Sequence, residues 1–225
     1  MENKDSPKSE EKKTKKQDNE LYWVLGVMVG LIAIFLVASS VVQSFSKVEY
    51  NGLTFTKEKL GDIQLFKYYY VTDKTVATGK VVDNAQLEPV IIYLRTNPNE
   101  NEVPINGGKI SFPRGKKVWV GIGDDLESCK YSPIAVSSVS SFISQNGFAH
   151  EAGLTDKTEA EENDLAHVEC SVYPNNPVII LKKGDETAVN IINENCYEIV
   201  ANDCEILPAS EKFIVQTILD AKENP

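Results

Sequence analysis

Two neighbouring carboxylates, Asp124 and Asp125, are the residues whose spacing is best suited to chemistry. They end the glycine-rich sequence GIGDD, which follows a predicted strand and precedes a predicted helix start at Ser132. Ligands of α/β sheets lie beyond the carboxyl ends of strands and beside helix N-termini, and carboxylate oxygens suit Ca²⁺ or Mg²⁺. We therefore predict a ligand or metal site at Asp124 and Asp125. The alternative is a loop of solvated acids, because the full dinucleotide-binding pattern is missing.

Two histidines, His150 and His167, are candidate general bases, because imidazole titrates near neutral pH. A hydrolase site would need His150 to converge with Asp124 and Asp125 in one cleft. Otherwise both are ordinary surface or hydrogen-bonded histidines. The chain contains no G-x-S-x-G, H-E-x-x-H, P-loop or C-x-x-C motif. The sequence therefore favours a protein that is not an enzyme and has no cofactor, with a hydrolase of unfamiliar site as an alternative.

The run Tyr68-Tyr69-Tyr70 is an aromatic feature that could contact a partner. It lies in a predicted strand, in which successive side chains point to opposite faces of the sheet. We therefore expect these tyrosines to face the core and the solvent in turn, with an exposed binding platform as the alternative.

Four cysteines follow residue 120, and their even number predicts two disulfides in an oxidising compartment. A zinc site is disfavoured, because no C-x-x-C pair is present and the two histidines are far apart in sequence. Free buried cysteines are the other alternative. Of the three possible pairings we favour Cys196–Cys204 with Cys129–Cys170, since the first would close a short hairpin.

Residues 21–45 form an uncharged, mostly apolar run of 25 residues, long enough for one transmembrane helix. A cleaved signal peptide or a buried helix are the alternatives. The lysine-rich residues 1–20 predict a disordered cytoplasmic tail, because positive flanks stay inside. This gives a signal-anchor protein of the cell membrane, single-pass and held in the lipid bilayer through residues 21–45, with residues 46–225 outside the cytoplasm.

Two glycines in the apolar run, Gly26 and Gly30, are four residues apart. Small residues at this spacing allow close packing of two helices in a membrane. They suggest the alternative of a subunit of a membrane complex, a sensor or an assembly factor. Glycines placed by chance in a lipid-facing helix explain the spacing equally well.

The chain of 225 residues has 42% hydrophobic residues, 25% charged residues and a formal net charge of −10. These values are typical of a folded protein. Residues 1–20 carry six lysines and six acids, so the whole negative charge lies on residues 21–225. Nucleic acid is therefore not an expected partner, because its binding depends on cations that neutralise phosphates.

The first part outside the apolar run is predicted to be rich in strands. Asn51-Gly52 is the strongest two-residue hairpin signal, with alternating residues on both sides. A second hairpin is expected within residues 103–112. The remaining predicted strands are residues 63–71 and 89–96.

The second part is predicted to be a mixed α/β unit, with a possible boundary near residue 113. Ser132 is the expected N-cap and Pro133 the first residue of a helix that ends at Gly147. A second helix is expected over 209–221, and residues 151–164 read as a polar loop or short helix. The predicted strands are 117–122, 166–173, 177–182, 187–193 and 196–201, with a tight turn at 183–185. The fold class is α+β with about two amphipathic helices.

Three segments resemble an uncharacterised group of membrane-anchored proteins from small-genome archaea. They are YLRTNPNENEVP (residues 93–104), KISF (109–112) and NCYEIVANDCEILPASEKFIVQTI (195–218). The resemblance implies an archaeal cell-surface setting and adds no catalytic residue. We expect a binding or structural module at the cell surface, with a protein partner in the membrane or the envelope.

Overall fold

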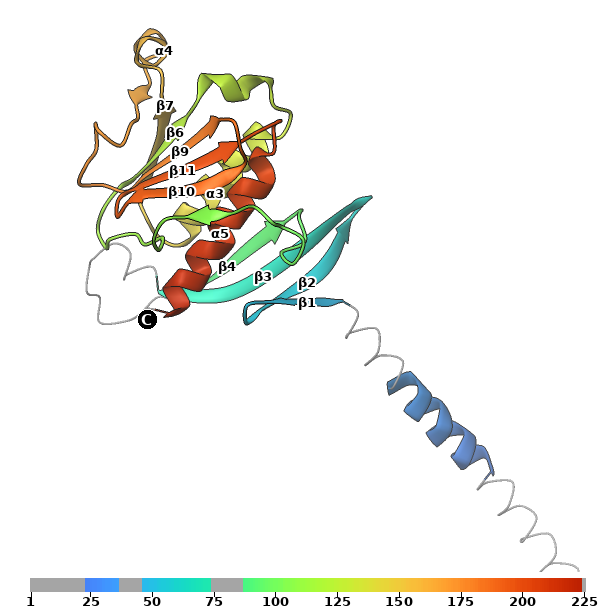
Figure 1. Ribbon diagram of the computed structural model, residues 1–225. Coiled ribbons are helices and arrows are strands. Elements are labelled where there is room, and N and C mark those ends of the chain that lie inside the picture. The colour runs from blue at the N-terminus through green and yellow to red at the C-terminus, as the bar shows by residue number, and fades with distance from the viewer. Residues whose placement is uncertain (1–22, 37–45, 74–86, 224–225) are drawn as a thin grey trace, which may run out of the picture. The chain divides into compact units, whose positions relative to one another are not determined.

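The computed structural model describes residues 23–36, 46–73 and 87–223 (Figure 1). The chain divides into two compact units, residues 1–47 and residues 48–225, which are described separately.

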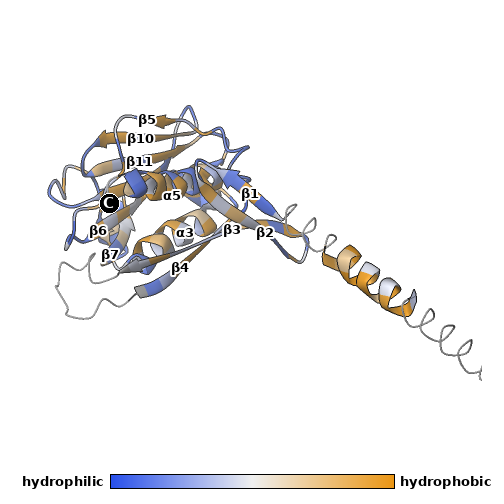
Figure 2. Ribbon diagram, turned by 90° about the horizontal axis from the view of Figure 1, so that it is seen from below, coloured by the Kyte–Doolittle hydropathy of each residue, from blue (hydrophilic) through white to orange (hydrophobic). Residues whose placement is uncertain are grey.

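In the first unit, residues 23–36 are helical, and most of their side chains are apolar (Figure 2). Within the described ranges, no helix is both long and apolar enough to cross a membrane. The fold class predicted from sequence, which included a transmembrane helix over residues 21–45, is therefore wrong on this point. Residues 1–22 and 37–45, on which the rest of that prediction falls, lie outside the described residues.

The second unit is α+β, as predicted, with a β-rich part that leads into a mixed α/β part. The β-rich part is a four-stranded sheet in the order β1-β2-β3-β4, here called sheet A. Asn51 and Gly52 both have positive φ, 46° and 76°, which confirms the predicted tight hairpin between the first two strands. The strands are β1 (Lys47–Tyr50), β2 (Leu53–Leu60), β3 (Ile63–Asp73) and β4 (Leu87–Leu94).

The mixed part is built on a seven-stranded sheet in the order β5-β10-β11-β9-β6-β7-β8, here called sheet B. The five strands from β11 to β8 in this order are parallel to one another, and β10 is antiparallel to β11. The strands are β5 (Ile105–Asn106), β6 (Val118–Ile122), β7 (His150–Leu154), β8 (Ala166–His167), β9 (Val178–Lys183), β10 (Ala188–Asn193) and β11 (Cys196–Ala201).

Two long helices, α3 (Ser132–Gln145) and α5 (Ile206–Glu223), form a middle layer between the two sheets (Figures 1 and 2). One hydrophobic core contains buried side chains of sheet A, of both helices and of sheet B. The α3 face predicted from its periodicity is confirmed, since Ala135, Val139 and Ile143 are fully buried. Both faces of α5 are covered, so this helix buries even the polar side chains of Ser210 and Glu211. Two short helices, η1 (Asp124–Ser128) and α4 (Lys157–Glu162), complete the unit.

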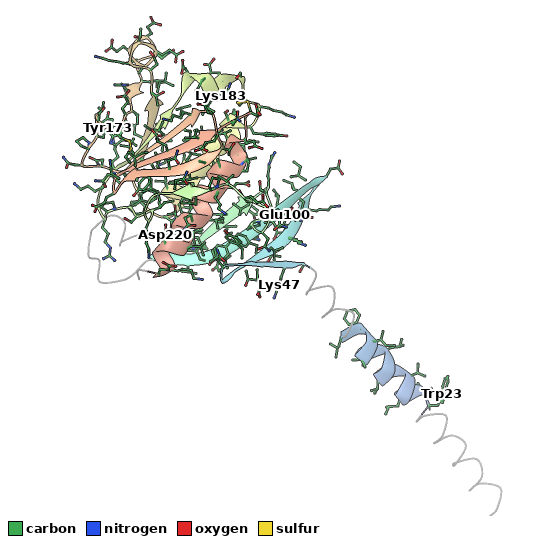
Figure 3. All side chains as sticks on the ribbon, viewed as in Figure 1. Trp23, Lys47, Glu100, Tyr173, Lys183 and Asp220 are labelled. Carbon is green, nitrogen blue, oxygen red and sulfur yellow. A yellow bond between two sulfur atoms is a disulfide. The ribbon has the colours of Figure 1, made fainter. Side chains whose placement is uncertain are left out.

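The opposite face of sheet B is covered in part by the chain that follows β8. Val168 packs there against Val178 and Ile180 in a small second cluster. Tyr173, labelled in Figure 3, stacks on Trp119 with 3.9 Å between ring centroids. Sheet B is therefore buried on the helix side and partly shielded on the other.

Two disulfides are present, Cys129–Cys204 and Cys170–Cys196. The number agrees with the prediction, but the favoured pairing Cys196–Cys204 is wrong. Cys196 is the first residue of β11, and Cys204 follows the last residue of the same strand. The two cysteines therefore lie at opposite ends of the strand, roughly 15 Å or more apart. Cys129 follows β6, which runs parallel to β11. Cys129 therefore lies at the same carboxyl-terminal end of the strands as Cys204, its disulfide partner. The two disulfides suggest an extracellular domain.

Several local predictions are corrected by the topology of sheet B. Residues 103–112 form no hairpin, because β5 pairs in parallel with β10. The turn at 183–185 joins strands that are not neighbours, since β11 lies between β9 and β10. β7 falls in the stretch predicted to be a loop or short helix, and the strand expected over 166–173 is only the two residues of β8. Ser132 does not cap α3: its hydroxyl donates to the carbonyl of Leu126, and the N-cap is Tyr131.

Candidate functional site

A cavity of about 490 Å³ lies where the carboxyl-terminal ends of α3 and α5 meet β3. The segment of residues 109–112 closes its remaining side. Its lining is mainly apolar, with aromatic side chains on opposite walls. The side chains that line it include Tyr68, Tyr70, Val71, Phe112, Phe142, Ile143, Phe148, Thr217, Ile218 and Ala221.

The first wall is formed by alternate tyrosines of β3. Tyr68 and Tyr70 point inward and are half-buried, whereas Tyr69 is 56% exposed on the outer face. The prediction that the run faces core and solvent in turn is confirmed. The Tyr68 ring lies 5.7 Å from that of Tyr70, and on its other side it packs at 5.3 Å against the fully buried ring of Phe55, which anchors it.

Burial keeps these tyrosine hydroxyls neutral. It raises the pKa of Tyr70 to about 12, although the hydrogen bond to Asn146 acts in the opposite direction. Burial also raises the pKa of Tyr68. The first wall therefore carries no charge near neutral pH.

The opposite wall is an aromatic cluster centred on Phe112. Its ring meets that of Phe148 edge to face at 5.6 Å and that of Tyr197 at 5.8 Å. Tyr197 is fully buried, and its hydroxyl lies 2.6 Å from the carbonyl oxygen of Ser111, to which it donates. This bond joins two residues that are eighty-six positions apart in sequence, and it holds residues 109–112 against sheet B.

Asp220 fixes the same segment to α5. Its side chain is 6% exposed, accepting from the backbone N–H of Ile110 at 2.8 Å and from the side-chain amide of Gln216 at 2.8 Å. Figure 3 places it near the end of α5. At the rim, Lys109 pairs with Glu223 at 2.7 Å, and both side chains are exposed. The polar groups of the rim thus serve to hold the walls in position.

Asn146 connects the end of α3 to the first wall. Its Oδ1 accepts from the Tyr70 hydroxyl at 2.8 Å, and its Nδ2 donates to the carbonyl of Phe142 at 2.8 Å. Gly147 then takes a positive φ of 83°, as expected for the residue that ends a helix. Both walls and both helix ends are therefore fixed by specific bonds around an unfilled space.

The described lining of the cavity is mainly apolar. Among the described lining residues there is no histidine and no hydroxyl paired with a general base. In the part of the chain that the structure describes, no group of three or more His, Cys, Asp or Glu side chains is placed to hold a metal ion. What the arrangement offers a ligand is mainly apolar surface with neutral hydroxyl and amide groups, and the charged side chains of Lys109, Asp220 and Lys222 also belong to the lining.

The residues singled out by sequence lie elsewhere. Asp124 and Asp125 belong to η1, at the carboxyl end of β6 as expected. Asp125 accepts from the backbone N–H of Lys183 at 3.1 Å, which gives it a structural contact. Asp124 lines a second crevice of about 510 Å³ with Glu127 and Glu159. Partial burial and then the neighbouring Asp124 raise the pKa of Glu159. A ligand site here stays a prediction.

The hydrolase constellation is not assembled. His150 pairs with Val118 at the start of β6, whereas Asp124 follows the end of the same strand. His150 and Asp124 therefore lie near opposite ends of β6, roughly 13 Å or more apart. His167 lies 3.5 Å from Glu169 and is part of no wider cluster in the described structure.

The two glycines of the helix over residues 23–36 have open surroundings. A Cβ added to Gly26 or to Gly30 would meet no other heavy atom within 4 Å. Neither glycine is therefore required for packing within the described chain. Their role in helix association stays a prediction.

The sequence did not predict the cavity, because its lining comes from segments as far apart in the chain as Tyr68 and Lys222. The only local signal was the alternation of Tyr68 and Tyr70 on β3. No known protein family, curated protein or solved structure matches this chain. The functional proposal therefore rests on the geometry described above.

Proposed function

We propose that residues 48–223 form an extracytoplasmic binding domain, not an enzyme, that receives an apolar ligand in the aromatic cavity. The observation that carries the proposal is the cavity itself. Other crevices of the described chain have similar volumes, and this one differs in having five aromatic side chains in its lining. A space of about 490 Å³ between fixed aromatic walls is within the range of ligand pockets.

The chemistry of the lining defines the class of ligand. Aromatic rings face the space from two sides, and the tyrosine hydroxyl of the first wall is uncharged. A flat aromatic or acyl group would bury its surface there with a gain of about 25 cal/mol per Å² before association costs. A free small molecule and the apolar part of an envelope component share this chemistry.

The two disulfides support a setting outside the cytoplasm. They tie both ends of β11 to neighbouring segments, so the sheet that carries the second wall is covalently braced. Such a rigid frame suits a preformed pocket, because less ordering entropy is lost on binding.

The test is titration of the full chain with N-phenyl-1-naphthylamine, a neutral fluorophore that brightens in apolar surroundings. Ala221 is exposed at the cavity, so Ala221→Trp should block it. Ala152 is exposed on β7 away from it, and Ala152→Trp is the matched control. We expect saturable binding that weakens at least tenfold in Ala221→Trp alone. Equal binding by both variants would exclude the cavity.

A further inference from the structure

A second surface feature, which shares only Phe142 with the cavity, lies along β4. This strand is the last in sheet A and has β3 as its only neighbour among the described strands. A groove of about 480 Å³ separates β4 from α3, with Ile92, Leu94 and Phe142 among its lining residues. A strand edge beside a helix is the geometry in which extended peptides are bound.

The direction of the backbone groups of β4 follows from one hydrogen bond and the register. Ile91, opposite Tyr69 of β3, donates its N–H to Oε1 of Gln145 at 3.2 Å, so this N–H points away from β3. Antiparallel pairs alternate between bonded and non-bonded. Tyr93 and Arg95 therefore direct their N–H groups outward as well, and Arg95 N–H is indeed bonded to Glu211 at 2.6 Å.

Most of this edge is protected against pairing with another strand. Pro89 has no N–H to donate. The N–H of Ile91 is already bonded to the side chain of Gln145, and those of Arg95 and Thr96 are bonded to Glu211. Tyr93 is the exception. No acceptor for its outward N–H is found within the described ranges, and its side chain is 48% exposed.

The helix beside Tyr93 leaves room for an incoming side chain. Three of the α3 residues that line the groove, Ser137, Ser138 and Ser141, are short, although Ile134, Phe142 and Gln145 of the same helix also line it. Two cations lie beyond the Leu94 end of the groove, and one of them, Arg95, also interacts with the buried carboxylate of Glu211. Arg95 and Lys130 both lie near the ring of Tyr131, at 5.7 and 5.3 Å from its centroid. This end complements a negative charge, in a chain whose own net charge is −10.

We propose that the edge of β4 at Tyr93 binds an extended, acidic and apolar segment of a partner protein as an added strand. The backbone of the segment pairs with the N–H and C=O of Tyr93. A backbone carbonyl of the segment also accepts the hydrogen bond of the Ile91 N–H in place of Gln145. An apolar side chain enters the groove over Phe142. A carboxylate of the segment faces Arg95 and Lys130.

The experiment measures binding of a panel of fluorescein-labelled hexapeptides to the full chain by anisotropy, up to about 1 mM. The peptides alternate valine with glutamate, with serine or with lysine. We expect the glutamate peptide to bind best and the lysine peptide at least tenfold more weakly. If no member of the panel binds saturably, or if the lysine peptide binds best, the proposal is overturned.

Three variants locate the interaction. Tyr93→Pro removes the outward N–H together with the tyrosine ring, and no N–H that faces β3 is lost, so β4 should still pair with β3 as it does at Pro89. It should weaken peptide binding at least tenfold relative to Tyr93→Val, which keeps the N–H. Gln145→Ala removes the competing acceptor and should strengthen binding several-fold. Equal affinities of the Pro and Val variants, both with the wild-type circular dichroism spectrum, would contradict the proposal.

Self-association is the competing use of this edge. Sedimentation of the wild-type chain should show a monomer. A dimer that Tyr93→Pro dissociates would identify a second copy as the occupant and overturn the proposal. Because cavity and groove share only Phe142, loss of peptide binding in Tyr93→Pro leaves fluorophore binding unchanged.

Discussion

Glu211 shows how a single buried carboxylate connects the layers of this domain. It is 2% exposed on α5 and accepts from two successive backbone N–H groups, those of Arg95 at 2.6 Å and Thr96 at 2.9 Å. Desolvation raises its pKa, while these hydrogen bonds and the Arg95 charge act in the opposite direction. The same side chain thus holds the end of β4 to α5 and prevents that end from pairing with another strand.

This raised pKa predicts a pH dependence of stability. The folded state binds the Glu211 proton more tightly than the unfolded state, whose pKa is near 4.5, so the contribution to stability falls as pH rises above 4.5. Urea unfolding of wild type and Glu211→Gln between pH 4.5 and 7.5 tests this. The free energy of unfolding of wild type minus that of the variant should decrease with pH. A difference that grows with pH would contradict the assignment.

Tyr70 and Asn146 form a second connection at the residue scale, between β3 and the end of α3. Tyr70→Phe removes the hydroxyl and leaves Oδ1 of Asn146 without its donor. The free energy of unfolding should fall by about 1 kcal/mol, measured by urea denaturation, with Tyr69→Phe on the exposed face as the matched control. An equal effect of the two substitutions would show that the bond does not stabilise the fold.

At the scale of elements, the disulfides join segments that the sheet topology brings together. Cys129–Cys204 closes a loop of 75 residues between the end of η1 and the turn before α5. Cys170–Cys196 closes one of 26 residues. The entropy of the closed loops predicts a loss of about 4 kcal/mol when the first pair is changed to alanine, and slightly less for the second. Thermal unfolding of both double variants measures which of them loses more stability. A larger loss for the variant without Cys170–Cys196 would contradict the prediction.

The pairing itself has a direct measurement in peptide mapping without reduction. It should yield fragments that join Cys129 to Cys204 and Cys170 to Cys196. Fragments that join Cys196 to Cys204 would restore the pairing expected from sequence and contradict the order of strands in sheet B.

Local patterns predicted the elements but not their neighbours. Asn51-Gly52 and the apolar face of α3 were readable because turn geometry and helix periodicity depend only on residues close in sequence. The disulfide pairing was not, because it depends on β6 and β11 being parallel strands that both flank β9. β7 was missed because its exposed residues at 151 and 152 gave a polar pattern on an otherwise paired strand.

The candidate site was still less predictable. Tyr68, Tyr69 and Tyr70 were expected to face the core and the solvent in turn, but the cavity beside Tyr68 and Tyr70 depends on how α3, α5 and residues 109–112 pack together. The predicted membrane-spanning helix fails for a different reason. Apolar composition was taken as sufficient, whereas no helix among the described residues is both long and apolar enough to cross a membrane.

At the scale of the whole molecule, residues 48–225 form one compact unit in which a layer of helices lies between two sheets. The two proposed sites use different parts of this arrangement. The cavity lies at the carboxyl-terminal ends of the helices, where the layers diverge, and the groove lies at the open edge of sheet A. Together they describe a binding domain, braced by disulfides, with one pocket for an apolar group and one edge for an extended chain.

The central claim is that the aromatic cavity binds apolar ligands, and amide NMR of the full chain tests it most directly. On titration with N-phenyl-1-naphthylamine, the largest shift changes should map to residues around the cavity, including Tyr70, Phe112 and Phe148. Amides at Asp124 and Tyr173, which are remote from it, should not move. Saturable changes confined to other regions, or none at all, would contradict the account.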